Sequence, residues 1–331
     1  MRTTSRFLGA ALAAALLAAC SGGSSIPFAS GGSGTSGSSN VRFPIVSPFA
    51  LRDDAGRVVN ERTHVFPTRE AAAGFAPMRG RHGSNLNYYG GPVQTTPHIA
   101  VVYWGFGTYG DPNGVQSDES NFLNNVEACC AYNKWINIVT QYTQSGGAHI
   151  TDNTGGISCS WNDNTNAVPS QPTDAQIQAE AQNLAAHCGS HDQNTSFVVS
   201  TPHGHNTSGF ATQWCAYHGY TSGYSTNISY TDMPYMPDGG ASCGANFINS
   251  GSGGTDDGVS VVGGHELAET QTDPQAGNGW LDSSGNEIGD KCAWSSASKD
   301  LSFGGSTLGT NYFPVQPLWD NAITGCATSG P

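Results

Sequence analysis

The chain has 331 residues, of which 11% are charged and 44 are glycine, whereas an ordinary soluble domain carries about 25% charged residues. This composition excludes a coiled coil and a charged disordered protein. The formal charge is −13, and from residue 83 onward three lysines stand against 21 acidic residues. Such a surface repels nucleic acid, whose binding requires Lys and Arg, so a cation is the expected partner.

The first forty residues have the features of an export and anchoring signal. Arg2 and Arg6 precede an unbroken small and apolar run over 7–19, too short to span a bilayer. The run ends in Leu-Ala-Ala-Cys20, which resembles the bacterial lipobox, whose cysteine carries lipid. We expect a signal peptide over 1–19 and a flexible Ser/Gly tether over 20–40. The protein would then be exported and lipid-anchored to the bacterial membrane, at the outer membrane or cell surface. An ordinary signal peptide is the alternative.

The cysteine count agrees with an exported protein. Nine cysteines less Cys20 leave eight, and an even number predicts disulfides. The pairs that we expect are Cys215 with Cys243 and Cys292 with Cys326, since each closes a loop-rich segment. No CxxC spacing is present, which argues against a zinc ribbon.

The remaining chain divides into an arm and a compact domain. Residues 41–84 are rich in arginine and have no strong hydrophobic period, which predicts a basic connecting arm. The compact domain is expected over 85–331. Its Gly-rich stretches at 203–213 and 239–259 are predicted loops.

Hydrophobic patterning predicts the main elements of this domain. Residues 98–104 and 196–201 are continuous apolar runs typical of buried strands. Residues 119–142 have helical spacing, and Thr173–Gln176 resembles a capping box that begins a helix ending before Gly189. The order β, α, α, β predicts a single layered mixed-sheet domain of the α/β or α+β class, loop-rich, disulfide-bonded and zincin-like.

Residues 260–274 (SVVGGHELAETQTDP) are the most informative stretch. An apolar side predicts a helix that Asp273-Pro274 ends. On that helix His265 and Glu269 lie one turn apart on one face, and Glu266 follows the histidine. This is the spacing of the HExxH metallopeptidase helix, with glutamate in place of the second histidine. The alternative is an amphipathic helix whose polar residues face solvent.

The expected cofactor is Zn²⁺, held by His265, Glu269 and a third ligand further along. Carboxylates bind zinc normally, but the extra anionic ligand also makes Ca²⁺ or another divalent cation plausible. Asp290 lies 21 residues beyond Glu269 and is the favoured third ligand, because Gly289 lets the backbone turn it inward. Glu287 is the substitute. A small calcium loop formed by Asp282, Ser284 and Asn286 is a weaker alternative.

Several short blocks resemble one known family. They are NLNYYGGPV (85–93), VVYWG (101–105), WCAYH (214–218), GGHELAETQTDP (263–274), NEIGDKCAW (286–294) and VQPLWDN (315–321) with Cys326. Together they resemble the EXORDIUM, or phosphate-induced protein, family over residues 85–326. The resemblance implies an exported, cell-surface or extracellular protein. It supplies no proven catalytic function, so the zincin-like site rests on the helix.

These observations predict a surface-anchored metallohydrolase, most simply a zincin-like peptidase. Glu266 would take a proton from the metal-bound water and deliver it to the leaving amine. His218 would orient a substrate carbonyl or stabilise an oxyanion. His203 and His205, in a glycine-rich loop, are weaker candidates. The substrate would be a peptide or a cell-wall polymer. No GxxxxGK[ST] motif is present, so nucleotide binding is not expected.

The alternative function is not enzymatic. In it the same residues hold a structural metal ion, and aromatic loops bind cell-wall polymer or a partner through Tyr217, Tyr220, Tyr224, Tyr230 and Tyr235.

Overall fold

A computed structural model describes residues 49–53, 55–74, 84–127, 134–152, 154–303 and 312–330. All of them belong to one compact unit that spans Phe43–Pro331. Cys20, the signal peptide and the tether predicted over 1–40 lie outside the described residues, as do Cys129 and Cys130.

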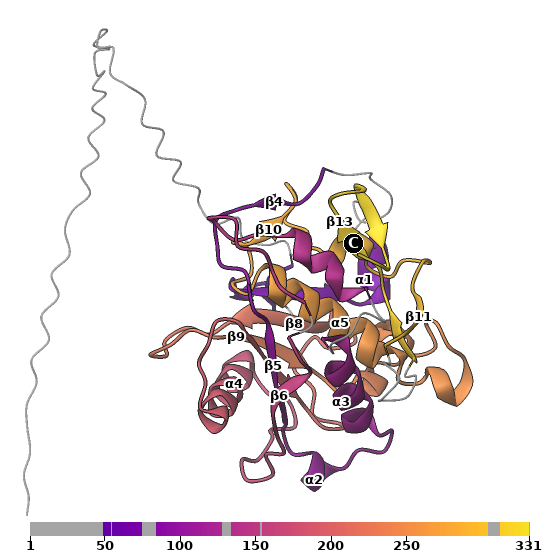
Figure 1. Cartoon of the computed structure of the whole chain (residues 1–331). Helices are drawn as coiled ribbons and strands as arrows, with labels where there is room; N and C mark the ends of the chain where they lie inside the picture. Colours follow the sequence, from indigo (N-terminus) through magenta and orange to yellow (C-terminus); the bar gives the residue numbers. More distant parts are fainter. Residues whose placement is uncertain are drawn as a thin grey trace, which may run out of the picture. The chain divides into compact units, whose positions relative to one another are not determined.

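A six-stranded mixed sheet organises this unit (Figure 1), with strand order β3-β8-β9-β7-β5-β6. Neighbouring strands are parallel from β9 to β6, whereas β8 is antiparallel to both β9 and β3. The strands are β3 (Thr63–Pro67), β5 (His98–Tyr103), β6 (Ile157–Trp161), β7 (Thr195–Ser200), β8 (Trp214–Tyr220) and β9 (Ser229–Met233).

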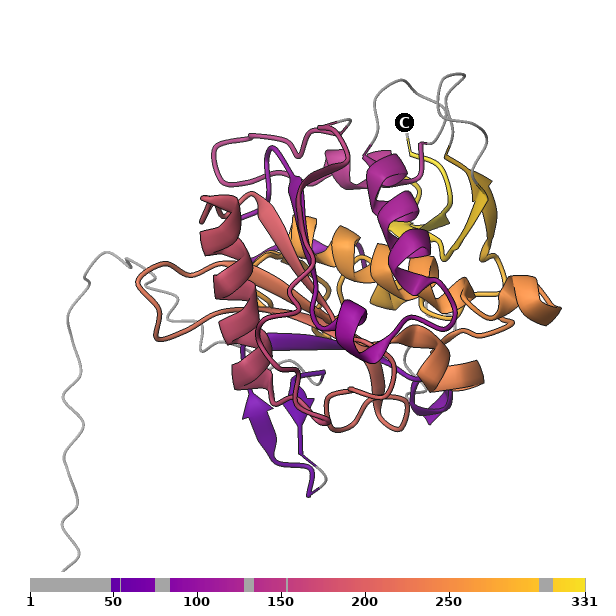
Figure 2. The same ribbon diagram turned by 90° about the horizontal axis from the view of Figure 1, so that it is seen from below.

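Helices cover both faces of the sheet (Figure 2). Helix α4 (Asp174–Cys188) lies on one face, and α3 (Val115–Val126) and α5 (Asp257–Thr272) lie on the other. The connections β5-α3-β6 and β6-α4-β7 move in opposite directions across the sheet. Because both parallel connections are expected to be right-handed, α3 and α4 must lie on opposite faces.

Shorter elements surround this core. The helical ones are α1 (Arg69–Gly74), α2 (Phe106–Tyr109), and the 3-10 helices η2 (Ile136–Gln141), η3 (Met236–Cys243), η4 (Gly251–Gly254) and η5 (Asp290–Cys292). Short strands pair as β1 (Leu51–Arg52) with β2 (Val58–Asn60), β4 (Asn87–Tyr88) with β10 (Trp280–Leu281), β11 (Lys299–Ser302) with β12 (Tyr312–Val315), and β13 (Leu318–Asp320) with β14 (Gly325–Ala327).

The predicted class, a mixed α/β domain with disulfides, is confirmed. Both predicted strands are present as β5 and β7. The capping box is also present, since the Thr173 side chain accepts from the Gln176 backbone amide and the Gln176 side chain accepts from the Thr173 backbone amide. At the other end of α4, Gly189 adopts the left-handed conformation and ends the helix. Features that depend on neighbouring residues, such as this capping box, can therefore be predicted from the sequence.

Two predicted boundaries are wrong. The helix expected over 119–142 begins at Val115 and ends at Val126, and residues 136–141 form the 3-10 helix η2. The basic arm over 41–84 is not separate from the compact domain, because β3 is the edge strand of the main sheet. Phe66 of β3 is fully buried. A five-residue strand carries too little periodicity to be recognised, and its burial depends on β8.

Disulfides join Cys215 to Cys243 and Cys292 to Cys326, as predicted, and also Cys159 to Cys188. Their presence indicates an oxidising, extracellular environment. In the described part of the chain, no helix is long and apolar enough to cross a membrane.

A buried carboxyl group under the sheet gives a pH-dependent prediction. Burial raises the pKa of Glu119 to about 7, the Ser200 hydroxyl that donates to it opposes this shift, and the charge of Asp111 adds to it. The folded state therefore holds this proton more tightly than the unfolded chain, whose glutamate titrates near 4.5. This contribution to stability is present at low pH and is lost as pH rises toward 7.

We expect Glu119→Gln to increase the free energy of unfolding by about 2–3 kcal/mol at pH 8 and to have little effect at pH 4.5. Glutamine mimics the protonated acid and can still accept from Ser200. Urea unfolding at the two pH values measures the difference, with the exposed Glu61→Gln as control. An equal effect at both pH values would contradict the assignment.

Candidate metal centre

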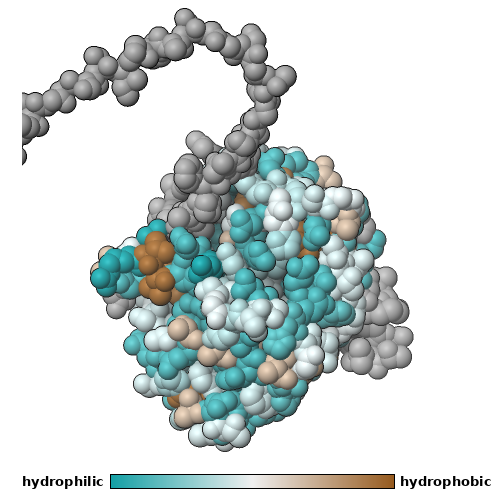
Figure 3. All heavy atoms as spheres, turned by 90° about the vertical axis from the view of Figure 1, so that its left-hand side faces the viewer, coloured by the Kyte–Doolittle hydropathy of each residue, from teal (hydrophilic) through white to brown (hydrophobic). Residues whose placement is uncertain are grey.

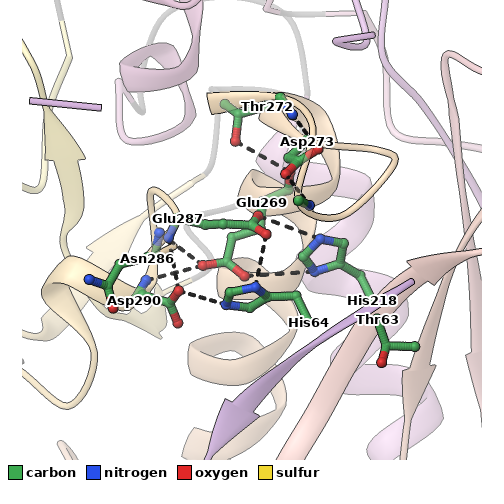
Figure 4. A network of polar contacts seen from close by, with 12 residues as sticks. Thr63, His64, His218, Glu269, Thr272, Asp273, Asn286, Glu287 and Asp290 are labelled. Carbon is green, nitrogen blue, oxygen red and sulfur yellow. Dashed lines mark hydrogen bonds and ion pairs between the residues drawn. The ribbon is translucent and has the colours of Figure 1, made fainter. Parts of the chain in front are cut away.

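The sheet register places two histidines side by side. His64 of β3 lies opposite His218 of β8, and their rings stack with centroids 5.8 Å apart. Successive side chains of a strand point to opposite faces. Tyr217 therefore points toward α4, where its hydroxyl donates to Asp174 at 3.1 Å, and both histidines point toward α5 (Figure 4).

Helix α5 supplies the residues of the HExxE motif. His265 Nε2 lies 3.0 Å from Glu269 Oε1, one turn further along. The helix packs closely on its surroundings, because Gly264 leaves no room for a Cβ beside Trp135 and Phe122. The Phe66 ring stacks on His265 with centroids 3.9 Å apart. As predicted, α5 ends at Thr272, directly before Asp273-Pro274.

The segment 287–290 brings both candidates for the third ligand to this helix. Asp290 Oδ1 lies 3.9 Å from His265 Nε2, and Asp290 Oδ2 lies 2.7 Å from His64 Nε2. Glu287 Oε1 lies 3.0 Å from His64 Nδ1, and its Oε2 lies 3.5 Å from His218 Nε2. The backbone amides of Gly289 and Asp290 donate to Glu269 Oε1, which fixes the segment against α5.

Seven side chains thus form one buried set, called the metal cluster below. Each is at most 1% exposed. Its members are His64, His218, His265, Glu266, Glu269, Glu287 and Asp290.

Two groups within the metal cluster can hold a metal ion. One consists of His64, Glu269 and Asp290, and the other of His218, Glu266 and Glu269, each with ligand atoms within 4.8 Å of one another. His265 contacts the first group, because its Nε2 lies 3.0 Å from Glu269 Oε1. Of the predicted ligands, Glu269 and Asp290 thus share a group with His64, whereas His265 belongs to neither group. The predicted catalytic residues Glu266 and His218 form the second group with Glu269.

The charges of the metal cluster are unbalanced. Burial alone lowers the pKa of His64, but the charges of Asp290 and Glu287 outweigh it and raise this pKa well above its ordinary value. Burial raises the pKa of Asp290, but His64 outweighs it, so the net shift is downward. Burial also raises the pKa of Glu266 and Glu287 strongly, and it lowers that of His218 to about 3. Glu266 and Glu287 therefore hold a proton more tightly than an ordinary glutamate, whereas Asp290 releases its proton more readily than an ordinary aspartate.

Several acceptor atoms of the metal cluster lack a donor. Glu266 Oε1, Glu269 Oε2 and Asp290 Oδ1 are buried and accept no hydrogen bond. Buried polar atoms are normally satisfied, and each unsatisfied one costs about 1–3 kcal/mol. A cation satisfies such oxygens, so the buried His/Glu/Asp side chains can hold a metal ion.

Sequence reasoning missed His64, because an isolated histidine between Thr63 and Val65 has no motif. The weaker alternative from the sequence was a calcium loop formed by Asp282, Ser284 and Asn286. There the Asp282 carboxylate accepts from Ser284, Asn286 and Lys291 Nζ, so protein donors already occupy it. His203 pairs with Asp238, and His205 contacts the Pro169 carbonyl.

The aromatic side chains proposed for polymer binding are mostly inaccessible. Tyr217, Tyr230 and Tyr235 are fully buried, which excludes them from a binding surface. Tyr224 is 39% exposed and Tyr220 is partly buried. The face drawn in Figure 3 is mainly hydrophilic to neutral, with small separated apolar areas.

Comparison of this chain with protein-family models, with characterised proteins and with solved structures finds no match. The resemblance to the EXORDIUM family therefore stays a prediction. Function has to be argued from the metal cluster.

Proposed function

We propose that the protein binds a divalent metal ion in the metal cluster, and zinc is the ion that we favour. The carrying observation is that four buried carboxylates have only histidines as ion-pair partners among the described residues. Burying several charges without compensation costs several kcal/mol each. A bound cation removes this cost, and no Lys or Arg in the described part of the chain pairs with these carboxylates.

The spacing of the ligand atoms supports this proposal. Atoms bound tetrahedrally to one zinc ion lie about 3.4 Å apart, since each is about 2.1 Å from the metal. The distance of 3.7 Å from His218 Nδ1 to Glu269 Oε2 exceeds an ordinary hydrogen bond and matches such a spacing. The imidazole in each group of possible ligands favours zinc over calcium, which prefers oxygen ligands.

The bound ion would have a structural role. It would join β3, β8, α5 and the segment 287–290, which are far apart in sequence. We place this domain on the outside of a bacterial cell, attached through lipid on Cys20 and the 20–40 tether. The resemblance to the EXORDIUM family supports a surface location, where the partner would be a peptide or a cell-wall polymer.

The second candidate function is a zinc-dependent peptidase, which would require the buried metal cluster to open to its substrate, because Glu266 is only 1% exposed. It is favoured by Glu266, whose Oε1 has no donor and whose Oε2 lies 3.0 Å from His218 Nδ1. A bound zinc ion would acidify a water molecule and polarise a carbonyl. Glu266 would then accept a proton at Oε1 and pass it to the leaving amine, while His218 orients Glu266.

Metal analysis and a peptidase assay test both functions. The protein, purified from the periplasm without added metal, is expected to contain at least one equivalent of zinc by inductively coupled plasma mass spectrometry. Glu269→Ala should lose metal, because Glu269 belongs to both possible groups of ligands, and the exposed Glu61→Gln should keep it. A folded wild-type chain that neither retains zinc nor takes up added zinc would overturn the proposal.

The peptidase candidate adds one outcome. Glu266→Gln should then retain metal and lose hydrolysis of a quenched fluorescent peptide library by about 100-fold or more. Absence of hydrolysis by the zinc-loaded wild type would leave the structural role as the function.

A further inference from the structure

We infer that the metal cluster holds two metal ions bridged by the Glu269 carboxylate, an inference that rests on the proposed metal binding. The two groups of possible ligands described above share one residue, Glu269. His64 and Asp290 would complete the first site, and His218 and Glu266 the second.

The two oxygens of Glu269 have different surroundings. Oε1 lies 3.0 Å from His265 Nε2 and accepts from the amides of Gly289 and Asp290. Oε2 accepts no hydrogen bond and lies 3.7 Å from His218 Nδ1. In Figure 4 the Glu269 side chain extends between His218 on one side and the His64–Asp290 pair on the other. This is the placement that a bridging carboxylate requires.

Each site also has an unpartnered buried oxygen of its own. Asp290 Oδ1 belongs to the first site and Glu266 Oε1 to the second, and neither accepts a hydrogen bond. A single ion bound to His64, Glu269 and Asp290 would leave Glu266 Oε1 unsatisfied. A second ion beside His218 removes that cost.

The ligand count agrees with two ions. The two sites together contain two imidazoles and three carboxylates, which exceed the four protein ligands that one structural zinc ion uses. Carboxylate-bridged pairs of metal ions about 3.5–4 Å apart are an established arrangement in hydrolases. The inference assigns Glu266 as a metal ligand of the second site, whereas the peptidase candidate leaves it free to transfer protons.

Native mass spectrometry of the full mature chain, stripped with EDTA and titrated with zinc, tests the inference. We expect two zinc ions per wild-type chain, about one in His64→Ala and in His218→Ala, and weakened binding of both in Glu269→Gln. The exposed His203→Ala is the matched control and should bind two. One zinc per wild-type chain would overturn the bridged pair and leave the proposed metal binding standing, and no zinc would overturn both.

A measurement on the wild type alone avoids variants that fail to fold. Loaded with two equivalents of Mn²⁺, a bridged pair should give a spin-coupled electron paramagnetic resonance spectrum. An isolated six-line Mn²⁺ signal at full loading would contradict the bridge.

Discussion

Treatment of the metal-loaded protein with EDTA at pH 7.5 is expected to lower its melting temperature by about 10 °C. A ligand present at about 1,000 times its dissociation constant stabilises the folded state by about 4 kcal/mol. In a domain of this size, 1 kcal/mol shifts the melting temperature by about 2–4 °C. Without the ion, Glu266 and Glu287, which are at most 1% exposed, can ionise only at a large desolvation cost. Differential scanning calorimetry measures the shift.

The control for this experiment is EDTA saturated beforehand with zinc, which should leave the melting temperature unchanged. Addition of zinc after chelation should restore it. An unchanged melting temperature in protein shown to have lost its metal would contradict a structural role. Disulfides remain intact under both conditions, so Cys292–Cys326 cannot account for a difference.

Gly289→Ala is expected to reduce zinc affinity by at least about 10-fold and to lower the free energy of unfolding by about 3 kcal/mol. A Cβ at Gly289 would lie 2.4 Å from His265 Nδ1. The imidazole cannot easily retreat, because Phe66 stacks on its ring. The segment that carries Asp290 would have to move, and the Gly289 amide would lose Glu269 Oε1.

Gly253→Ala is the matched control for this substitution. Its Cβ would meet nothing within 4 Å, and its backbone is not in the left-handed region. Isothermal titration with zinc and urea unfolding should show little change in this control. Equal behaviour of the two variants would show that the close approach of Gly289 to His265 has no role in the metal cluster.

Gly289 also shows how a sequence-based reason can differ from the structural one. The sequence suggested that glycine permits a turn there, but its φ is −80°, which any residue can adopt. Glycine is required by space, since the backbone passes directly against the His265 ring. Lack of space depends on a contact between residues 24 positions apart, which no local pattern records.

The sequence by itself determined the local elements and the residues of the motif helix. Buried strands, the Thr173 capping box and the α5 helix with His265, Glu266 and Glu269 follow from periodicity and capping, which are properties of neighbouring residues. Two disulfides could be predicted from loop closure, and Asp290 from its spacing to the helix.

Only the tertiary structure decided the composition of the metal cluster. His64 enters it because β3 pairs with β8 and places this histidine opposite His218. A shift of β3 by one residue would turn His64 away from α5, because strand side chains alternate between faces. Such pairing joins residues 154 positions apart through backbone hydrogen bonds that carry no sequence signature. Helix α5 with its HExxE motif can therefore be predicted from the sequence. His64 and His218 come close to this helix only because β3 and β8 pair and the sheet packs on α5.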